Sequence, residues 1–475
     1  MKLLIGLLII LTIFYLSFNN WKTAVKAVFF LTVIEGALRK WVLPQASELI
    51  YFLKDFVLLG AYIRFYGTAA TRGKFRMINH PLNILIILVF IWCVVQALNP
   101  SLGTLVVGIF GLKTYLFYIP LIWMLPTLFP TEESLYKFLR SHLLLIIPVG
   151  ILGIVQFFSP ITSPINTYAP TSSGVTEIAT FGGATNETRS LVRITGSFSY
   201  INNYTAYLVV CFGLLIALLS INQPRWWRLI FMIEISLVAI NSLMTGSRTP
   251  VIASALFILG YLLIRGLTEI SATLRLIRQF MLPVLVVITV TYLGFSSAIN
   301  AFVARASGNS DLSHRLFISF LEPFSFIQYK DVDGFGVGST HPGSAALRGV
   351  LNLPAGEIIP IGYESEMGRV ILEIGPIGFF LWYSLRIIIL GSLLIVFWKL
   401  RRPLLRQLAL AAFLIQLSWL NGQLVFHHTF SVYYWFLTGF IFLLPWLEHR
   451  ENLYRQQQIL QENAEFQDLT GTSDG

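Results

Sequence analysis

Apolar runs long enough to cross a lipid bilayer recur from one end of the chain to the other. A helix needs about 17–25 apolar residues to cross a hydrocarbon core of about 30 Å. Lipid offers the backbone no hydrogen-bond partners, so only helices and closed barrels can span it. The runs are continuous and do not alternate with polar residues, which predicts an all-α transmembrane bundle of about 12–13 spans. The predicted spans are 3–18, 22–40, 48–66, 82–98, 104–128, 138–158, 203–221, 226–243, 249–264, 280–298, 367–398, 405–421 and 430–447.

The composition excludes a soluble globular protein, because 56% of the 475 residues are hydrophobic and only 12% are charged. The net charge of +10 does not indicate a nucleic-acid partner, since the basic residues gather in short loops between spans. By the positive-inside rule these loops are cytoplasmic. Their basic residues are Arg72, Lys74, Arg76, Arg225, Arg228, Arg265, Arg275, Arg278, Lys399, Arg401, Arg402 and Arg406.

This orientation divides the chain into four parts. Residues 1–298 hold transmembrane spans with an outer loop at 159–202, and 299–364 form a large periplasmic loop. Residues 365–447 hold the C-terminal spans, and 448–475 form a cytoplasmic tail. Within the large loop, 314–327 is predicted to form an amphipathic helix along the membrane surface.

A charged segment at the start of span 367–398 is the first predicted functional feature. Glu366, Arg369 and Glu373 recur at i, i+3 and i+7, so on a helix they form one polar stripe. Charges at a membrane edge are costly and usually face a cavity or a partner. We therefore expect an active-site loop that ends on this helix.

Three arginines on the predicted outer face lie beside the starts of separate spans. They are Arg193, Arg248 and Arg369. Helix N-termini carry free N–H groups and partial positive charge, and arginine binds phosphate oxygens well. The arrangement predicts a phosphate or diphosphate site, with Ser247 supporting it as a helix cap. Arg315, in the large loop, is predicted to contact an anion or a lipid headgroup. The alternative is that these arginines snorkel or pair with nearby glutamates.

Acid and base candidates lie in the same region. His341 sits in a Gly-Ser-Thr-Pro loop, where a solvent-reachable histidine near its ordinary pKa would act as a general base. Glu364 and Glu366 are the alternative bases, and Glu373 is a supporting carboxylate. The structural alternatives are an incidental loop histidine and a salt-bridge network at a helix start. No outer loop has metal-ligand spacing, so no metal or cofactor is predicted.

Charged residues also interrupt the first apolar runs. Glu35 and Arg39 are i, i+4 neighbours and are expected to pair on a helix. Lys54 and Asp55 lie inside an apolar run and are expected to face other helices. A structural role as ion pairs within the bundle is favoured for this group. The pair His427-His428 lies at a span edge and is expected to be interfacial.

The order of four patterns resembles the bacterial O-antigen polymerase and O-antigen ligase superfamily. M-T-G-S-R-T-P (244–250) resembles its T-x-S-R segment, and E-I-G-P-I-G (373–378) resembles its E-x-G-x-x-G landing helix. H-R-L-F-I-S-F (314–320), followed by G-F-G-V-G-S (334–339), resembles its arginine-led helix and glycine-rich turn. E-G-A-L-R-K-W-V-L-P (35–44) is similar to a segment of polymerase-like members.

The resemblance implies a metal-independent, inverting membrane glycosyltransferase of the bacterial inner membrane. Its substrate would be a glycan on undecaprenyl pyrophosphate, and other polysaccharide assembly proteins would be its partners. Ligase-like members carry a histidine about nine residues before the landing-helix glutamate, and here that position is Glu364. This departure favours a polymerase of repeat units for O-antigen or exopolysaccharide. The alternatives are a ligase that transfers glycan to a lipid A core and, from another class, a transporter of polysaccharide intermediates.

Overall fold

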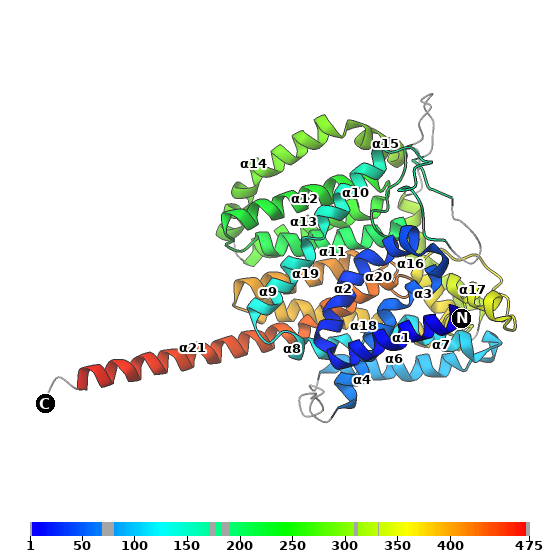
Figure 1. The fold of residues 1–475 in the computed structure, drawn as a ribbon, viewed down its shortest axis with the longest axis horizontal. Helices are drawn as coiled ribbons and strands as arrows, with labels where there is room; N and C mark the ends of the chain where they lie inside the picture. Colours follow the sequence, from blue (N-terminus) through cyan, green and yellow to red (C-terminus); the bar gives the residue numbers. More distant parts are fainter. Residues whose placement is uncertain are drawn as a thin grey trace.

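The computed structural model describes residues 2–68, 80–170, 177–181, 191–268, 270–307, 312–330 and 332–471, and these form an all-α bundle (Figure 1). Within these ranges the only β pairing is a single bridge between Thr180 and Val192. The helices are α1 (Lys2–Asn19), α2 (Trp21–Ala37), α3 (Ser47–Tyr51), α4 (Leu53–Gly67), α6 (Pro81–Ala97), α7 (Leu105–Leu116), α8 (Leu121–Leu128), α9 (Glu132–Leu143), α10 (Ile146–Phe158), α11 (Ile201–Leu219), α12 (Arg225–Met244), α13 (Arg248–Thr268), α14 (Ile270–Gly294), α15 (Ser296–Ser307), α16 (Leu312–Phe326), α17 (Pro342–Leu351), α18 (Glu366–Lys399), α19 (Pro403–Ser418), α20 (His428–Thr438) and α21 (Phe440–Gly471).

The predicted polytopic membrane class is confirmed. Six helical stretches in the described residues are long and apolar enough to cross a bilayer, and α7 with α8 makes a seventh if the bent pair counts as one span. The central helices are α11 and α20, which are almost entirely buried, whereas α13 leaves most of its apolar surface outside the bundle. A helix that is apolar all round and exposed on one side is expected where lipid is the solvent.

The two ends of the bundle differ, as Figure 1 shows. At one end α21 projects far beyond the other helices, and the junctions α11–α12, α13–α14 and α18–α19 lie on the same side. We call this the tail end. The described parts of 159–202 and 299–364, together with α15, α16 and α17, lie at the opposite end, here called the loop end. The basic junctions and the long polar segments are therefore separated in the way the positive-inside rule predicts.

Several predicted boundaries hold and others are wrong. The predicted starts near 203, 250 and 367 correspond to α11, α13 and α18. The predicted span 104–128 is broken, because its two helices meet at a 44° bend with Pro120 at the junction. Most of the predicted span 280–298 lies in α14, whose helix begins ten residues earlier, at Ile270, and ends at Gly294. The large loop is also more helical than its turn residues indicate, since it holds α16, close to the predicted 314–327, and α17.

A break inside α18 positions the glycine-rich turn 334–338. Gly375 has φ +66° and Pro376 follows it, so the helix cannot continue regularly there. The turn docks into the break, where the Phe335 N–H donates to the Leu372 carbonyl at 2.7 Å. Gly334 lies so close that an added Cβ would stand 2.6 Å from the Gly375 nitrogen. The docked turn leads directly into His341 and α17.

Candidate functional site

A cavity of about 450 Å³ opens among segments that are distant in sequence and meet at the loop end. The lining combines apolar and aromatic side chains with charged and polar ones, and the latter are here called the polar wall: Arg39, Glu48, Asn203, His341, His427 and His428. One face of α17 forms part of the wall through residues spaced as neighbours on a helix. The lining residues are Arg39, Glu48, Tyr51, Phe52, Phe110, Pro170, Tyr200, Asn203, His341, Pro342, Gly343, Ala346, Leu347, Val350, Phe426, His427 and His428.

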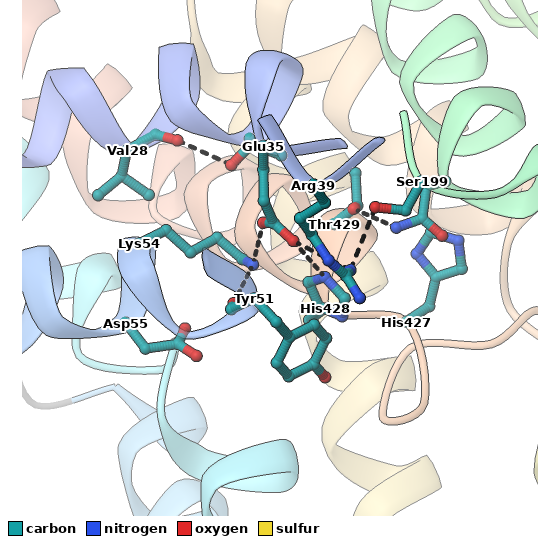
Figure 2. A network of polar contacts seen from close by, with 12 residues as sticks. Val28, Glu35, Arg39, Tyr51, Lys54, Asp55, Ser199, His427, His428 and Thr429 are labelled. Atoms are coloured by element: carbon teal, nitrogen blue, oxygen red, sulfur yellow. Dashed lines mark hydrogen bonds and ion pairs between the residues drawn. The ribbon is translucent and has the colours of Figure 1, made fainter. Parts of the chain in front are cut away.

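A buried network of charges lies behind the polar wall (Figure 2). The Glu35 carboxylate lies 2.5 Å from Lys54 Nζ and 3.6 Å from the Arg39 guanidinium. Asp55, which follows Lys54 on α4, lies 2.8 Å from Lys113 Nζ and accepts a 2.6 Å hydrogen bond from the Tyr118 hydroxyl. All five charged side chains are buried or nearly so. The predicted Glu35–Arg39 pair is thus confirmed, as is the expectation that Lys54 and Asp55 face other helices.

The network has one more positive charge than negative, because three cations share two carboxylates. The cation that reaches the cavity wall is Arg39. Its Nε donates to Ser47 Oγ at 3.0 Å and its Nη1 donates to Ser199 Oγ at 3.1 Å, while its plane lies over the Tyr51 ring. Arg39 lies in a π-helical turn, Leu38–Val42, that continues α2. Arg39 thus places a rigidly held guanidinium at the cavity lining, where it can bind an anionic group.

His341 does not have the environment predicted for a general base. It caps α17, with Nδ1 accepting the Gly343 N–H at 2.9 Å, and its ring packs against Phe110 and Phe426. Burial, together with the positive charges of Lys113 and Arg369, lowers the pKa of His341 to about 3. A neutral ring whose Nδ1 accepts a hydrogen bond carries its proton on Nε2. The side chain therefore offers the cavity a hydrogen-bond donor.

His427 is buried and His428 is largely covered by neighbouring side chains, while the expectation that the pair lies at the membrane interface stays a prediction. His427 caps α20, with Nδ1 accepting the Phe430 N–H at 3.1 Å, and burial lowers its pKa to about 4. His428 packs its ring against Tyr51 at 4.4 Å, and its Nε2 lies 3.7 Å from the Glu35 carboxylate. Both rings thus belong to the polar wall of the cavity.

The Glu366 carboxylate is occupied by structural contacts. It is fully buried, pairs with Arg386 at 3.3 Å and accepts hydrogen bonds from the backbone of Leu424 and Val425. Those contacts hold the segment that carries Phe426 into the cavity wall. The predicted role as a base is therefore replaced by a positioning role, because the carboxylate faces the loop it anchors.

Glu373 anchors the other side of the cavity. It is buried, and its Oε1 accepts hydrogen bonds from Thr340 N at 2.9 Å and from Thr340 Oγ1 at 2.8 Å. Thr340 directly precedes His341, so Glu373 fixes the start of α17. This agrees with the supporting role predicted for Glu373. Glu364, in contrast, is exposed just before α18 and is not among the lining residues.

The three predicted arginines do not share one set of contacts. Arg369 lies over the rings of Tyr363 and Phe426, at 5.2 and 5.0 Å, and has no ion pair among the described residues. Since Phe426 also lines the cavity, Arg369 stands directly behind its wall.

Arg193 and Arg248 belong together at another place. Arg193 Nε donates to the Thr245 carbonyl at 2.9 Å, in the turn from α12 to α13 that holds Ser247 and Arg248. Neither arginine is among the residues that line the cavity. The shared three-arginine site stays a prediction. The side chain of Arg315 lies outside the described residues.

Sequence reasoning missed Arg39, Glu48 and Asn203 as parts of a site. The available signal was the set of charges inside the first apolar runs, because an ionisable group within a membrane span is a functional candidate by default. In the described part of the chain, no three His, Cys, Asp or Glu side chains lie close enough together to hold a metal ion.

No family model matches this chain, and no curated protein matches it in sequence. The resemblance to the O-antigen polymerase and ligase superfamily therefore remains a prediction based on its motifs.

Proposed function

We propose that the protein is a membrane glycosyltransferase that polymerises undecaprenyl-pyrophosphate-linked oligosaccharide units into a surface polysaccharide. The reaction would take place on the outer side of a bacterial inner membrane, with the large loop periplasmic and the C-terminus cytoplasmic. The observation that carries the proposal is Arg39, a guanidinium at the lining of a loop-end cavity that is otherwise lined largely by apolar and aromatic side chains. A lipid diphosphate presents this combination of negative charge and hydrocarbon.

The chemistry follows from the groups around the cavity. An acceptor hydroxyl attacks the anomeric carbon of the donor, and negative charge develops on the departing diphosphate. Arg39 and Arg369 are suited to hold that charge, because guanidinium groups bind phosphate oxygens in a fixed geometry. The neutral His341 adds a hydrogen-bond donor at Nε2, which can stabilise an oxyanion without becoming charged. Donors fixed in advance stabilise developing charge at little reorganisation cost.

The test is the polymer-size profile of a strain that lacks this protein and is complemented with variants. Arg39→Ala should abolish the polymer and accumulate single lipid-linked units, and Arg39→Lys should restore it only in part. Arg401→Ala is the matched control, because Arg401 is an exposed arginine at the tail end. Normal chain length in the Arg39→Ala strain would contradict the proposal. Arg248→Ala and Arg369→Ala in parallel would show which of the predicted arginines share the site.

Two alternatives give different profiles in the same experiment. If the protein is a ligase, the Arg39→Ala strain should accumulate full-length lipid-linked polymer that is not transferred to its acceptor. If it is a transporter, the same strain should retain its lipid-linked intermediates on the cytoplasmic side. The lining residues come from segments at the loop end, which supports a site open to one side over a passage across the membrane.

A further inference from the structure

The cavity wall holds one carboxylate that has no structural task. Among the described lining residues, Glu48 is the only acidic one. Its side chain is exposed and makes no hydrogen bond or ion pair with any of the described residues. An unpaired carboxylate that faces a cavity is free to accept a proton from a bound molecule.

The other carboxylates near the cavity are already occupied. Glu35 is held between Lys54 and Arg39, and Asp55 is held by Lys113 and Tyr118. Glu366 and Glu373 anchor backbone segments, as described above. His341 is neutral and uses Nδ1 to cap α17, so its ring has no free lone pair facing the cavity. These contacts leave Glu48 as the available carboxylate at the cavity lining.

The short helix that carries Glu48 is tied to Arg39 at both ends. Glu48 lies on α3, and the preceding residue Ser47 donates to the Pro170 carbonyl at 2.9 Å and accepts from Arg39 Nε at 3.0 Å. One turn later the Tyr51 ring lies under the Arg39 guanidinium. A base must be fixed within hydrogen-bond reach of its proton to be effective.

We propose that Glu48 is the general base that deprotonates the acceptor hydroxyl. This inference rests on the proposed function. As the acceptor oxygen forms its bond to the anomeric carbon, its proton passes to the Glu48 carboxylate. The bond from the anomeric carbon to the phosphate oxygen breaks, and the diphosphate leaves with the electron pair beside Arg39. The aromatic ring of Tyr200, which also lines the cavity, offers a flat apolar surface on which a sugar ring can pack.

The experiment uses the purified full-length protein and the lipid-linked saccharide extracted from a strain that lacks it. Glu48→Gln should lower kcat by 100-fold or more, as general-base removal typically costs about 10²–10⁴-fold. Glu48→Asp should be intermediate, because the shortened carboxylate is displaced from its proton. Glu133→Gln, an exposed carboxylate at the tail end, is the matched control. Binding of farnesyl diphosphate, a soluble probe of the leaving group, should persist in Glu48→Gln and weaken at least tenfold in Arg39→Ala.

The pH dependence of kcat is a second measurement, and it would not change in the variant if Glu48 had only a structural role. In the wild type, kcat should fall on the acidic side as the base becomes protonated, and this limb should disappear in Glu48→Gln. A Glu48→Gln protein with near wild-type kcat would overturn the assignment of the base while leaving the glycosyltransferase proposal intact. A larger loss of kcat in Glu364→Gln than in Glu48→Gln would have the same meaning. A wild-type protein that extends no saccharide would overturn both.

Discussion

At the scale of single residues, the site depends on how burial changes ordinary side-chain chemistry. His341 is a base by residue type, yet its surroundings make it a neutral donor, because an aromatic pocket and two nearby cations disfavour its charged form. Glu366 is likewise an acid by type but serves as a backbone anchor. Glu48, in contrast, is exposed at the cavity lining and makes no ion pair among the described residues.

The low pKa of His341 has a consequence for stability that can be measured. An unfolded histidine has a pKa of about 6.5 and the folded His341 has a pKa of about 3, so between these values the unfolded chain binds more protons. The free energy of unfolding should therefore fall as the pH drops from about 6.5 toward 3. His341→Asn retains a side-chain oxygen that can cap α17 but removes the titration. We expect a smaller loss of melting temperature between pH 7.5 and pH 5 in this variant than in the wild type.

His427 contributes to the same loss, because its pKa is also lowered, to about 4. His427→Asn should therefore reduce the acid sensitivity independently, and the double variant should reduce it most. Equal acid sensitivity in the wild type and the double variant would contradict the assignment of neutral histidines. Thermal melting of the detergent-solubilised protein gives the comparison.

At the scale of elements, the break in α18 and the glycine-rich turn act as one unit. Gly334 has φ +67° and faces backbone atoms of Leu372, Glu373 and Gly375, so a side chain there has no room. Gly334→Ala should destabilise the protein by more than about 1 kcal/mol, because it combines an unfavourable φ with a backbone clash. Since the turn carries Thr340 and His341 into place, activity should fall with stability.

Gly349 is the matched control for that substitution. It lies in α17, and no atom stands within 4 Å of an added Cβ. Gly349→Ala should leave the melting temperature unchanged or raise it slightly, because alanine favours a helix over glycine by about 0.5–1 kcal/mol. Melting curves of the two variants, measured side by side, test whether the turn is fixed by close contact. Equal effects of the two substitutions would contradict this.

The elements were largely predictable from the sequence, and the site was not. Length and apolarity determine the spans, and the residues before α13 and α18 mark their starts clearly. The bend between α7 and α8 depends on packing as well as on Pro120, so the apolar run alone conceals it. The cavity needs Arg39, His341 and His428 to meet, and no sequence pattern spans those distances. The charges in the first apolar runs were visible, but their place behind a cavity appears only in three dimensions.

At the scale of the whole molecule, the separation of the loop end from the tail end carries the proposed function. The proposed reaction can take place on the outer surface only if the cavity opens there. The side of the membrane that the cavity faces is therefore the property to measure. The two cysteines, Cys93 and Cys211, are buried in helices and can be replaced by alanine to give a background without thiols. Val350→Cys then places one thiol in the cavity wall, and Gln457→Cys places one on the exposed part of α21.

In intact spheroplasts, a maleimide that cannot cross the membrane should label the cysteine at position 350 and leave the one at position 457 unlabelled. After lysis both should react, which shows that each thiol is accessible in itself. This outcome follows from the basic junctions at the tail end, since segments rich in Lys and Arg are retained in the cytoplasm. Labelling of both positions before lysis would place the two ends on the same side. Labelling of position 457 alone would show that the cavity faces the cytoplasm, which would contradict an outer-surface glycosyltransferase.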